Sequence, residues 1–237
     1  MPNHVTTVCR VTGPEPDLVR FLAAHVVAVD ASPARFSFHS VIPMPDVVRA
    51  TESSSDSSLG YVALRGKVPP ERLHQSSNVA VYLDGYGMLP RNVRDQASLR
   101  SWLTANRPGA LALGQRVADA LDETGFATWY DWACARWGTK WDAYSYETRE
   151  REVGLAAFKF ESAWAFPEPV FRKLAKLYPL LVFTVESFDE GWNFACVGAF
   201  NGPNDYRRVD ATKELYERVY GEPPDADEDA SDTAVPS

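Results

Sequence analysis

Apolar and polar positions alternate clearly at the beginning of the chain. Residues 5–11 follow this alternation, which predicts a strand that ends at Gly13 and Pro14. Between residues 17 and 27 apolar side chains recur at helical spacing, so a helix is expected there. A short strand is predicted at residues 35–41, where two following prolines stop the ladder.

The middle of the chain has a weaker pattern, rich in serine, glycine and turn residues. Its sequence predicts a polar loop at 51–58, strands at 60–64 and 78–83, and helices at 108–122 and 128–138. Gly125 and Gly138 are placed where helix ends are expected, and Thr128 is placed to cap the second helix.

The final third is again strongly patterned. It predicts strands at 155–164, 180–186 and 192–200, a helix from 167 to 178, and a last helix at 211–220. A strand followed by Gly13-Pro14-Glu15-Pro16 and a helix near the start is echoed by a strand, Phe166-Pro167-Glu168-Pro169 and a helix near the end.

This echo predicts an α+β fold of the ferredoxin-like split β-α-β type. Residues 1–221 then form a single domain with a largely helical insertion at about 46–124, and residues 222–237 form a disordered acidic tail. The alternative is that the repeated Pro-Glu-Pro is simply good chemistry for starting a helix.

Charge adds little to this picture once it is divided along the chain. The 237 residues carry a formal charge of −8, and residues 222–237 hold six acidic side chains and no basic one. The body therefore has no overall electrostatic signature for or against a polyanionic partner. The amino terminus has no leader pattern and no stretch is long and apolar enough for a membrane helix, so a soluble cytoplasmic protein without membrane contact is expected.

Known chemical motifs are not found. The segment from Gly60 to Gly66 and Lys67 has the wrong glycine spacing for a phosphate loop, and no hydroxyl follows the lysine. The four histidines are isolated and the three cysteines lie far apart. No catalytic residue, metal or cofactor is expected from the sequence, although a triad assembled from distant positions has no sequence signature.

Tryptophan is the unusual component. Six of the seven tryptophans lie between residues 129 and 192. The candidate binding residues are Trp129, Asp131, Trp132, Trp137, Thr139, Lys140, Trp141, Glu161 and Trp164. One interpretation places these rings in the core, with Lys140 extending its stem over Trp141. The other makes them an exposed surface that binds a protein or stacks nucleic-acid bases.

Several segments resemble the YubB-like ferredoxin-fold family of phage and conjugative-plasmid proteins, a domain of unknown function. These segments are residues 1–5, 38–45 and 129–132, the string WGTKWDA at 137–143, and FESAW at 160–164. The similarity covers roughly residues 1–45 and 125–200. It implies a ferredoxin-like α+β fold and no particular activity.

Three functional hypotheses follow. The first is a non-enzymatic mobile-element protein that binds a host protein, for example a component of a defence or DNA-processing system. The second is a nucleic-acid-binding accessory protein that uses the arginines of residues 91–116 together with exposed rings. The third is a small enzyme with Asp131, Lys140 and Glu161 as its polar groups.

Overall fold

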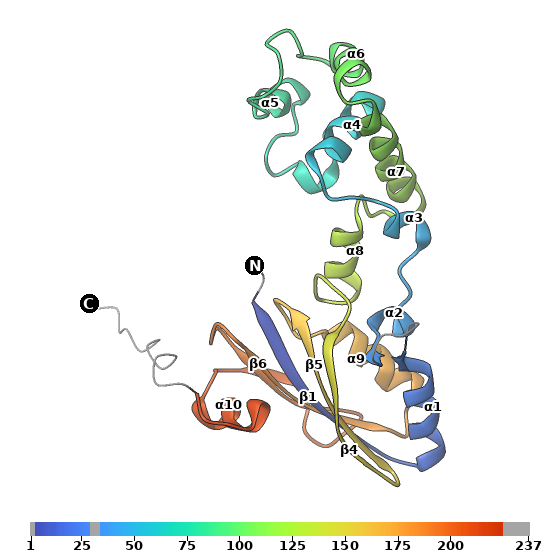
Figure 1. Ribbon diagram of the computed structural model, residues 1–237, viewed down its shortest axis with the longest axis vertical. Helices are drawn as coiled ribbons and strands as arrows, with labels where there is room; N and C mark the ends of the chain where they lie inside the picture. Colours follow the sequence, from blue (N-terminus) through green and yellow to red (C-terminus); the bar gives the residue numbers. More distant parts are fainter. Residues whose placement is uncertain (1–2, 29–33, 225–237) are drawn as a thin grey trace, which may run out of the picture. The chain divides into compact units, whose positions relative to one another are not determined.

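The computed structural model describes residues 3–28 and 34–224, which fall into two compact units. The first unit consists of Met1–Pro43 and Arg136–Ser237, and the second of Met44–Ala135 (Figure 1). The insertion expected at about 46–124 falls inside the second unit. Most of the acidic tail expected at 222–237 lies outside the described residues.

The first unit is built on a six-stranded antiparallel sheet with the strand order β4-β5-β1-β6-β7-β8. Its strands are β1 (His4–Thr12), β4 (Tyr144–Glu152), β5 (Leu155–Ala163), β6 (Val182–Asp189), β7 (Ala195–Phe200) and β8 (Arg207–Val209). A separate two-stranded ladder joins β2 (Val26–Val27) to β3 (Arg35–Phe36). Helices and an antiparallel sheet together make this an α+β structure.

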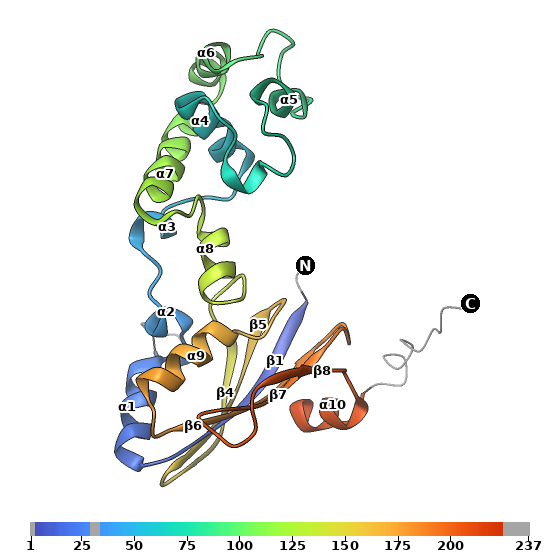
Figure 2. The same cartoon turned by 180° about the vertical axis from the view of Figure 1, so that it is seen from behind.

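Helices cover both faces of the sheet (Figure 2). On one face lie α1 (Glu15–His25), α9 (Glu168–Leu177) and the short α2 (Phe38–Val41), and on the other lies α10 (Lys213–Tyr220). The core under α1 and α9 is aromatic. Its fully buried phenylalanines are Phe21, Phe36, Phe38, Phe158, Phe160, Phe171 and Phe183. Phe188 points to the opposite face, where it packs with Leu215 and Val219 of α10.

The beginning and end of the chain confirm the hydrophobic pattern. The predicted strand at 5–11 is β1, and the backbone turns into α1 at Gly13, where φ is +154°. A Cβ atom at this glycine would lie 2.6 Å from the carbonyl oxygen of Leu180, so a larger residue would not fit. The strand at 155–164, the helix after Pro167, the strands at 180–186 and 192–200 and the last helix are all present as well, with shifts of up to three residues at their ends.

The second unit is helical. It contains α3 (Asp46–Arg49), α4 (Ser55–Arg65), η1 (Pro70–Arg72), α5 (Val79–Asp84), α6 (Gln96–Asn106), α7 (Pro108–Thr124) and α8 (Trp129–Arg136), the last of which reaches one residue beyond the unit. The helices predicted at 108–122 and 128–138 are α7 and α8. The loop predicted at 51–58 is correct only for residues 51–54, because α4 begins at Ser55. The strands predicted at 60–64 and 78–83 are wrong.

Side-chain caps explain these errors. Ser54 and Ser57 form a capping box that starts α4 inside the serine-rich segment, and the Asn78 side chain accepts from the first backbone N–H groups of α5. Gly60, in the middle of α4, lets α7 approach closely, since a Cβ there would meet the Ala110 carbonyl oxygen at 1.8 Å.

The strand predicted at 35–41 is correct only for its first two residues. Ser37 accepts from the backbone N–H of Ser40 and thereby starts α2. The carboxylate of Asp142 accepts a further bond from the backbone N–H of Phe38. Two side-chain caps thus turn the chain from strand to helix at a point where its apolar pattern continues.

Candidate binding surface

Most of the WGTKWDA segment has a structural role. Trp137 is buried, and its Nε1 donates to the carbonyl oxygen of Ile42 over 2.9 Å. Gly138 has a φ of +80°, and a Cβ there would lie 2.8 Å from Cδ of Pro169. Thr139 is also buried, and its hydroxyl donates to the carbonyl oxygen of Ala163 over 2.6 Å and accepts from the N–H of the same residue. These contacts fasten the segment to the end of β5.

The end of the segment is anchored as well. Asp142 accepts hydrogen bonds from the Ser37 hydroxyl over 3.0 Å and from the backbone N–H of Phe38. Ala143 is buried. The side chains of Lys140 and Trp141 therefore take no part in these anchoring contacts and face the solvent.

The FESAW segment shows the same division. Phe160 and Ala163 are buried, and the Ser162 hydroxyl donates to the carbonyl oxygen of Ala165 over 2.8 Å. Trp164 is exposed and has a φ of +71°, a left-handed conformation that is rare for a bulky residue. Its N–H donates to the carbonyl oxygen of Asn3, which extends the pairing of β1 and β5 by one bond. Such a conformation costs on the order of 1–3 kcal/mol and is concentrated at functional sites.

These two segments meet at what we call the tryptophan platform, formed by Lys140, Trp141 and Trp164. The Lys140 Nζ lies 4.5 Å from the ring centroid of Trp141 and 4.8 Å from that of Trp164. Trp141 is 38% exposed and Trp164 is 42% exposed. Each cation–π contact at an exposed site stabilises by about 0.5–1 kcal/mol, so the ammonium group holds both rings in place without burying them.

A polar group adjoins the platform on the neighbouring strands. The Tyr144 hydroxyl lies 2.7 Å from Nδ1 of His4, and Oε2 of Glu161 lies 3.8 Å from the same nitrogen. Burial, together with the carboxylates of Glu161 and Glu190, raises the pKa of Tyr144 to about 12. Tyr144 therefore keeps its proton at neutral pH. Its ring also contacts that of Trp141, with centroids 6.4 Å apart, and so links the polar group to the platform.

Sequence reasoning missed His4 and Tyr144 as neighbours of Glu161. In the structure both residues begin strands that flank β5, and the register pairs Tyr144 with Glu161 and His4 with Ala163. A register of this kind is set by the assembled sheet. The sequence pattern alone did not identify which strands are neighbours.

Three predicted site residues belong to the second unit. Trp129 donates its backbone N–H to the Thr51 hydroxyl over 2.8 Å, and Trp132 is buried. Asp131 accepts from the hydroxyl of Thr128 over 2.6 Å and donates its N–H back to that oxygen, which caps α8. These contacts give Asp131 a structural role.

The remaining six predicted residues lie in the first unit. The structure brings Lys140, Trp141, Glu161 and Trp164 to one end of β5, beside Thr139, and buries Trp137. Among residues 3–28 and 34–224, no group of three His, Cys, Asp or Glu side chains is placed to hold a metal ion. No helix in this part of the chain is both long and apolar enough to cross a membrane.

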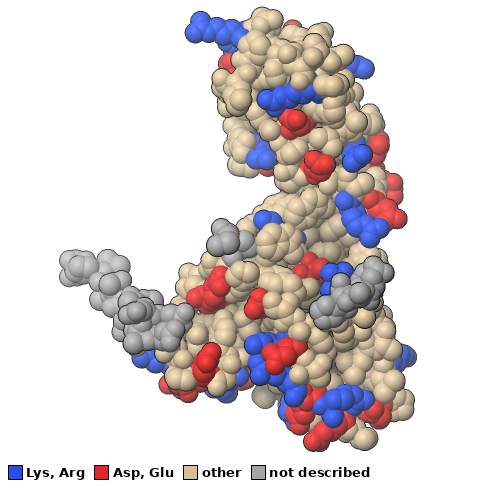
Figure 3. Space-filling view, viewed as in Figure 1, with Lys and Arg blue, Asp and Glu red and all other residues tan. Residues whose placement is uncertain are grey.

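Ion pairs cover the sheet face beside the platform. Arg10 pairs with Glu150 over 2.7 Å, and Lys159 pairs with Glu147 over 3.5 Å. Figure 3 shows basic and acidic side chains interspersed on this part of the first unit. The face therefore presents no broad field of one sign.

The arginines of residues 91–116 are also partly paired within the second unit. Arg94 pairs with Asp84, and Arg107 pairs with Asp56 over 2.6 Å while lying over the ring of Trp102. Arg91 and Arg100 are exposed. The basic character of this segment is thus smaller in the folded chain than its sequence indicates.

Comparison with known proteins gives one structural similarity. No protein-family model and no curated protein matches the chain. The fold is similar to the crystal structure of a protein api92 from Yersinia pseudotuberculosis, described as DUF1281, with a TM-score of 0.43 and 10% sequence identity over 90% of this chain and 99% of that one.

Proposed function

We propose that the protein is a non-enzymatic interaction protein of a phage or conjugative plasmid that binds a host protein through the tryptophan platform. The observation that carries the proposal is the placement of Lys140 between two exposed tryptophan rings. Tryptophan is enriched among the few residues that dominate protein–protein binding energy, because a rigid ring offers a large contact area at little entropic cost.

The charges around the platform favour a protein over a nucleic acid as its ligand. Glu161 lies beside the platform, and Glu190 accepts from the backbone N–H of the neighbouring His4. These carboxylates lie near Tyr144, whose ring contacts Trp141, and they repel phosphate groups on this side of the platform. A partner with an apolar pocket for the rings and a carboxylate for Lys140 fits the chemistry of this surface.

The setting in a phage or plasmid, and in the cytoplasm of a bacterial host, rests on the resemblance to the YubB-like family. We also infer a ferredoxin-like arrangement for the first unit. It is supported by the strand order β4-β5-β1-β6, in which β1, β4, β5 and β6 are the first to fourth strands of the six-stranded sheet in chain order, and by α1 and α9 on one face.

Quantitative capture from a host lysate tests the binding proposal. Tagged wild-type protein is compared with Trp141→Ala and with Leu180→Ala, a matched control because Leu180 is an apolar residue of the first unit that is 63% exposed. The captured protein is then purified and its affinity measured against each variant.

We expect wild type and Leu180→Ala to bind this partner equally. Trp141→Ala should bind it at least about thirty-fold more weakly, which corresponds to a loss of about 2 kcal/mol or more. Unchanged thermal unfolding of both variants shows that the fold is retained. If wild type and the two variants bind the partner with equal affinity, the platform is not part of the binding site.

A further inference from the structure

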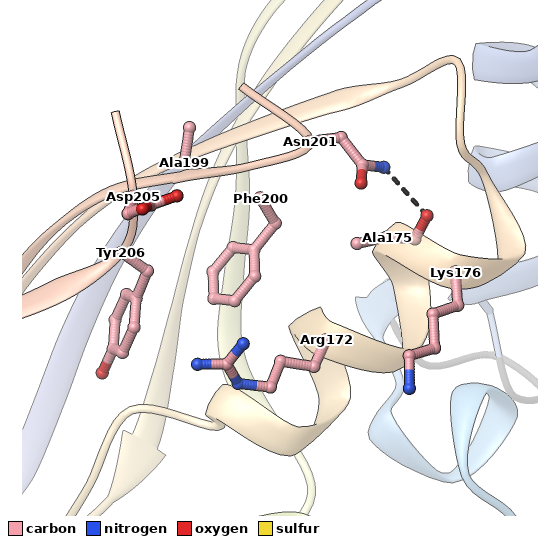
Figure 4. A pocket seen from close by; sticks show the side chains of 8 residues that line it. All are labelled: Arg172, Ala175, Lys176, Ala199, Phe200, Asn201, Asp205 and Tyr206. Atoms are coloured by element: carbon pink, nitrogen blue, oxygen red, sulfur yellow. Dashed lines mark hydrogen bonds between the residues drawn. The ribbon is translucent and has the colours of Figure 1, made fainter. Parts of the chain in front are cut away.

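A groove lies between α9 and the β7–β8 edge of the first unit. It has two adjoining hollows that share Arg172 and Tyr206. The first, of about 590 Å³, is shown in Figure 4. The second, of about 430 Å³, runs past Phe194 and Arg208 to Trp164. We call the two hollows together the β8 groove.

Aromatic rings form one side of the β8 groove. Tyr206 packs against both Phe166 and Phe200, with ring centroids 4.9 and 5.2 Å away, and those two rings lie 6.2 Å from each other. The Tyr206 hydroxyl donates to Sγ of Cys196 over 3.2 Å, which fixes the ring. Figure 4 shows Phe200 and Tyr206 side by side, with the Arg172 side chain extending from α9 toward them. The groove therefore has a rigid apolar wall.

Basic side chains line both hollows. Arg172 and Lys176 belong to the first, while Arg208 belongs to the second. Arg207 precedes Arg208 on β8 and pairs with Val197, so its side chain points to the opposite face of the sheet, where it borders another hollow. The guanidinium carbon of Arg208 lies 4.1 Å from the ring centroid of Phe194, and this cation–π contact positions the charged group.

Most of this positive charge is available to a ligand. Within the described ranges, Lys176 and Arg208 form no ion pair with an acidic side chain, whereas Arg172 pairs with Glu168. Asp205 is the other acidic residue of the two hollows. In the second unit, by contrast, two of the five arginines of residues 91–116 pair with aspartates.

We propose that the β8 groove binds single-stranded nucleic acid, with Lys176 and Arg208 on its phosphates and Trp164 stacked on a base. Guanidinium groups bind phosphate oxygens through two parallel hydrogen bonds. The exposed ring of Trp164 at the end of the second hollow offers a stacking surface that every base fits. An acidic peptide would satisfy the basic side chains, but it carries no base to stack on this exposed ring.

This proposal goes beyond the protein-binding function, and Trp164 is the one residue that the groove shares with the tryptophan platform. The test therefore leaves Trp164 unchanged. It uses the pair Lys176→Gln and Arg208→Gln, both exposed and outside the platform. The matched control is the pair Arg91→Gln and Arg100→Gln, which removes the same charge from exposed positions of the second unit.

Fluorescence anisotropy with a labelled oligothymidylate of about fifteen nucleotides measures the binding of the full chain over a series of salt concentrations. Single-strand binding loses affinity with a logarithmic slope of about −0.7 for each phosphate contact. We expect the Lys176/Arg208 variant to bind at least tenfold more weakly at low salt and to have a slope smaller by about 1.4. The Arg91/Arg100 variant should behave as wild type.

Three results would overturn the proposal. The first is no binding of the oligonucleotide by the wild type at low salt. The second is an equal loss of affinity in the two double variants, which would assign the binding to net charge. The third is displacement of the oligonucleotide by polyglutamate of equal charge at the same concentration as by unlabelled oligonucleotide, which would make the groove a site for acidic peptides.

Discussion

His25 makes the stability of the first unit depend on pH. The ring is 5% exposed and lies on α1 against Phe21. Its Nδ1 is 2.8 Å from the Ser40 hydroxyl and its Nε2 is 3.0 Å from the Tyr178 hydroxyl. Burial lowers the pKa of His25 from 6.5 to about 4, because the charged ring would lose its hydration.

The sign of the effect follows from proton binding. Between pH 6.5 and about 4 the unfolded chain binds a proton at His25 that the folded chain does not, so the free energy of unfolding falls as the pH falls. At about 1.4 kcal/mol for each pH unit, the loss between pH 7 and pH 4 is roughly 3 kcal/mol. The whole of this contribution is present above pH 6.5.

Urea unfolding of the wild type and of His25→Gln, followed by near-ultraviolet circular dichroism, measures this loss. Carboxylates titrate in both proteins, so their contribution cancels in the difference. We expect the wild type to lose roughly 3 kcal/mol more than His25→Gln between pH 7 and pH 4. Parallel stability curves for the two proteins would refute the reasoning.

Three further substitutions test the packing and the anchors. Gly114→Ala should lower the free energy of unfolding measured in urea by about 2 kcal/mol or more, because its Cβ would lie 2.1 Å from the carbonyl carbon of Gly60. Gly109→Ala is the control, since its Cβ has open space and should not lower the free energy of unfolding. Asp142→Ala removes the second of the two acceptors at the start of α2 and should cost about 0.5–2 kcal/mol in thermal unfolding. Thr139→Val should cost about 1–3 kcal/mol in the same measurement, since it leaves a buried N–H and carbonyl without their partner, and an unchanged melting temperature would contradict this role.

The sequence predicted the first unit better than the second for a physical reason. In β1, β5 and α9 one face is buried and the other is solvated, so apolar positions recur with the period of the element. In α4 the run Ser57–Ala63 is buried without interruption, and Gly60 sits against α7. A helix buried on all sides has no amphipathic period, and its serines and glycine favour a loop or a strand when read alone.

The candidate site was predicted as a set of residues, but their separate roles were not. Trp137 and Trp141 lie in the same short segment and have the same chemistry. Only the folded chain shows that Trp137 donates to the carbonyl oxygen of Ile42 while Trp141 lies exposed beside Lys140. The difference depends on contacts with residues about a hundred positions earlier in the sequence, which no local pattern contains.

Photo-crosslinking inside the host tests the tryptophan platform most directly. Trp141 is replaced by photoreactive p-benzoylphenylalanine in one protein, and Val153, which is 88% exposed on the same unit, is replaced in the control. Binding through the platform predicts a crosslinked adduct with one host protein from position 141 and none from position 153. The same adducts in equal yield from both positions, or none from position 141, would contradict it.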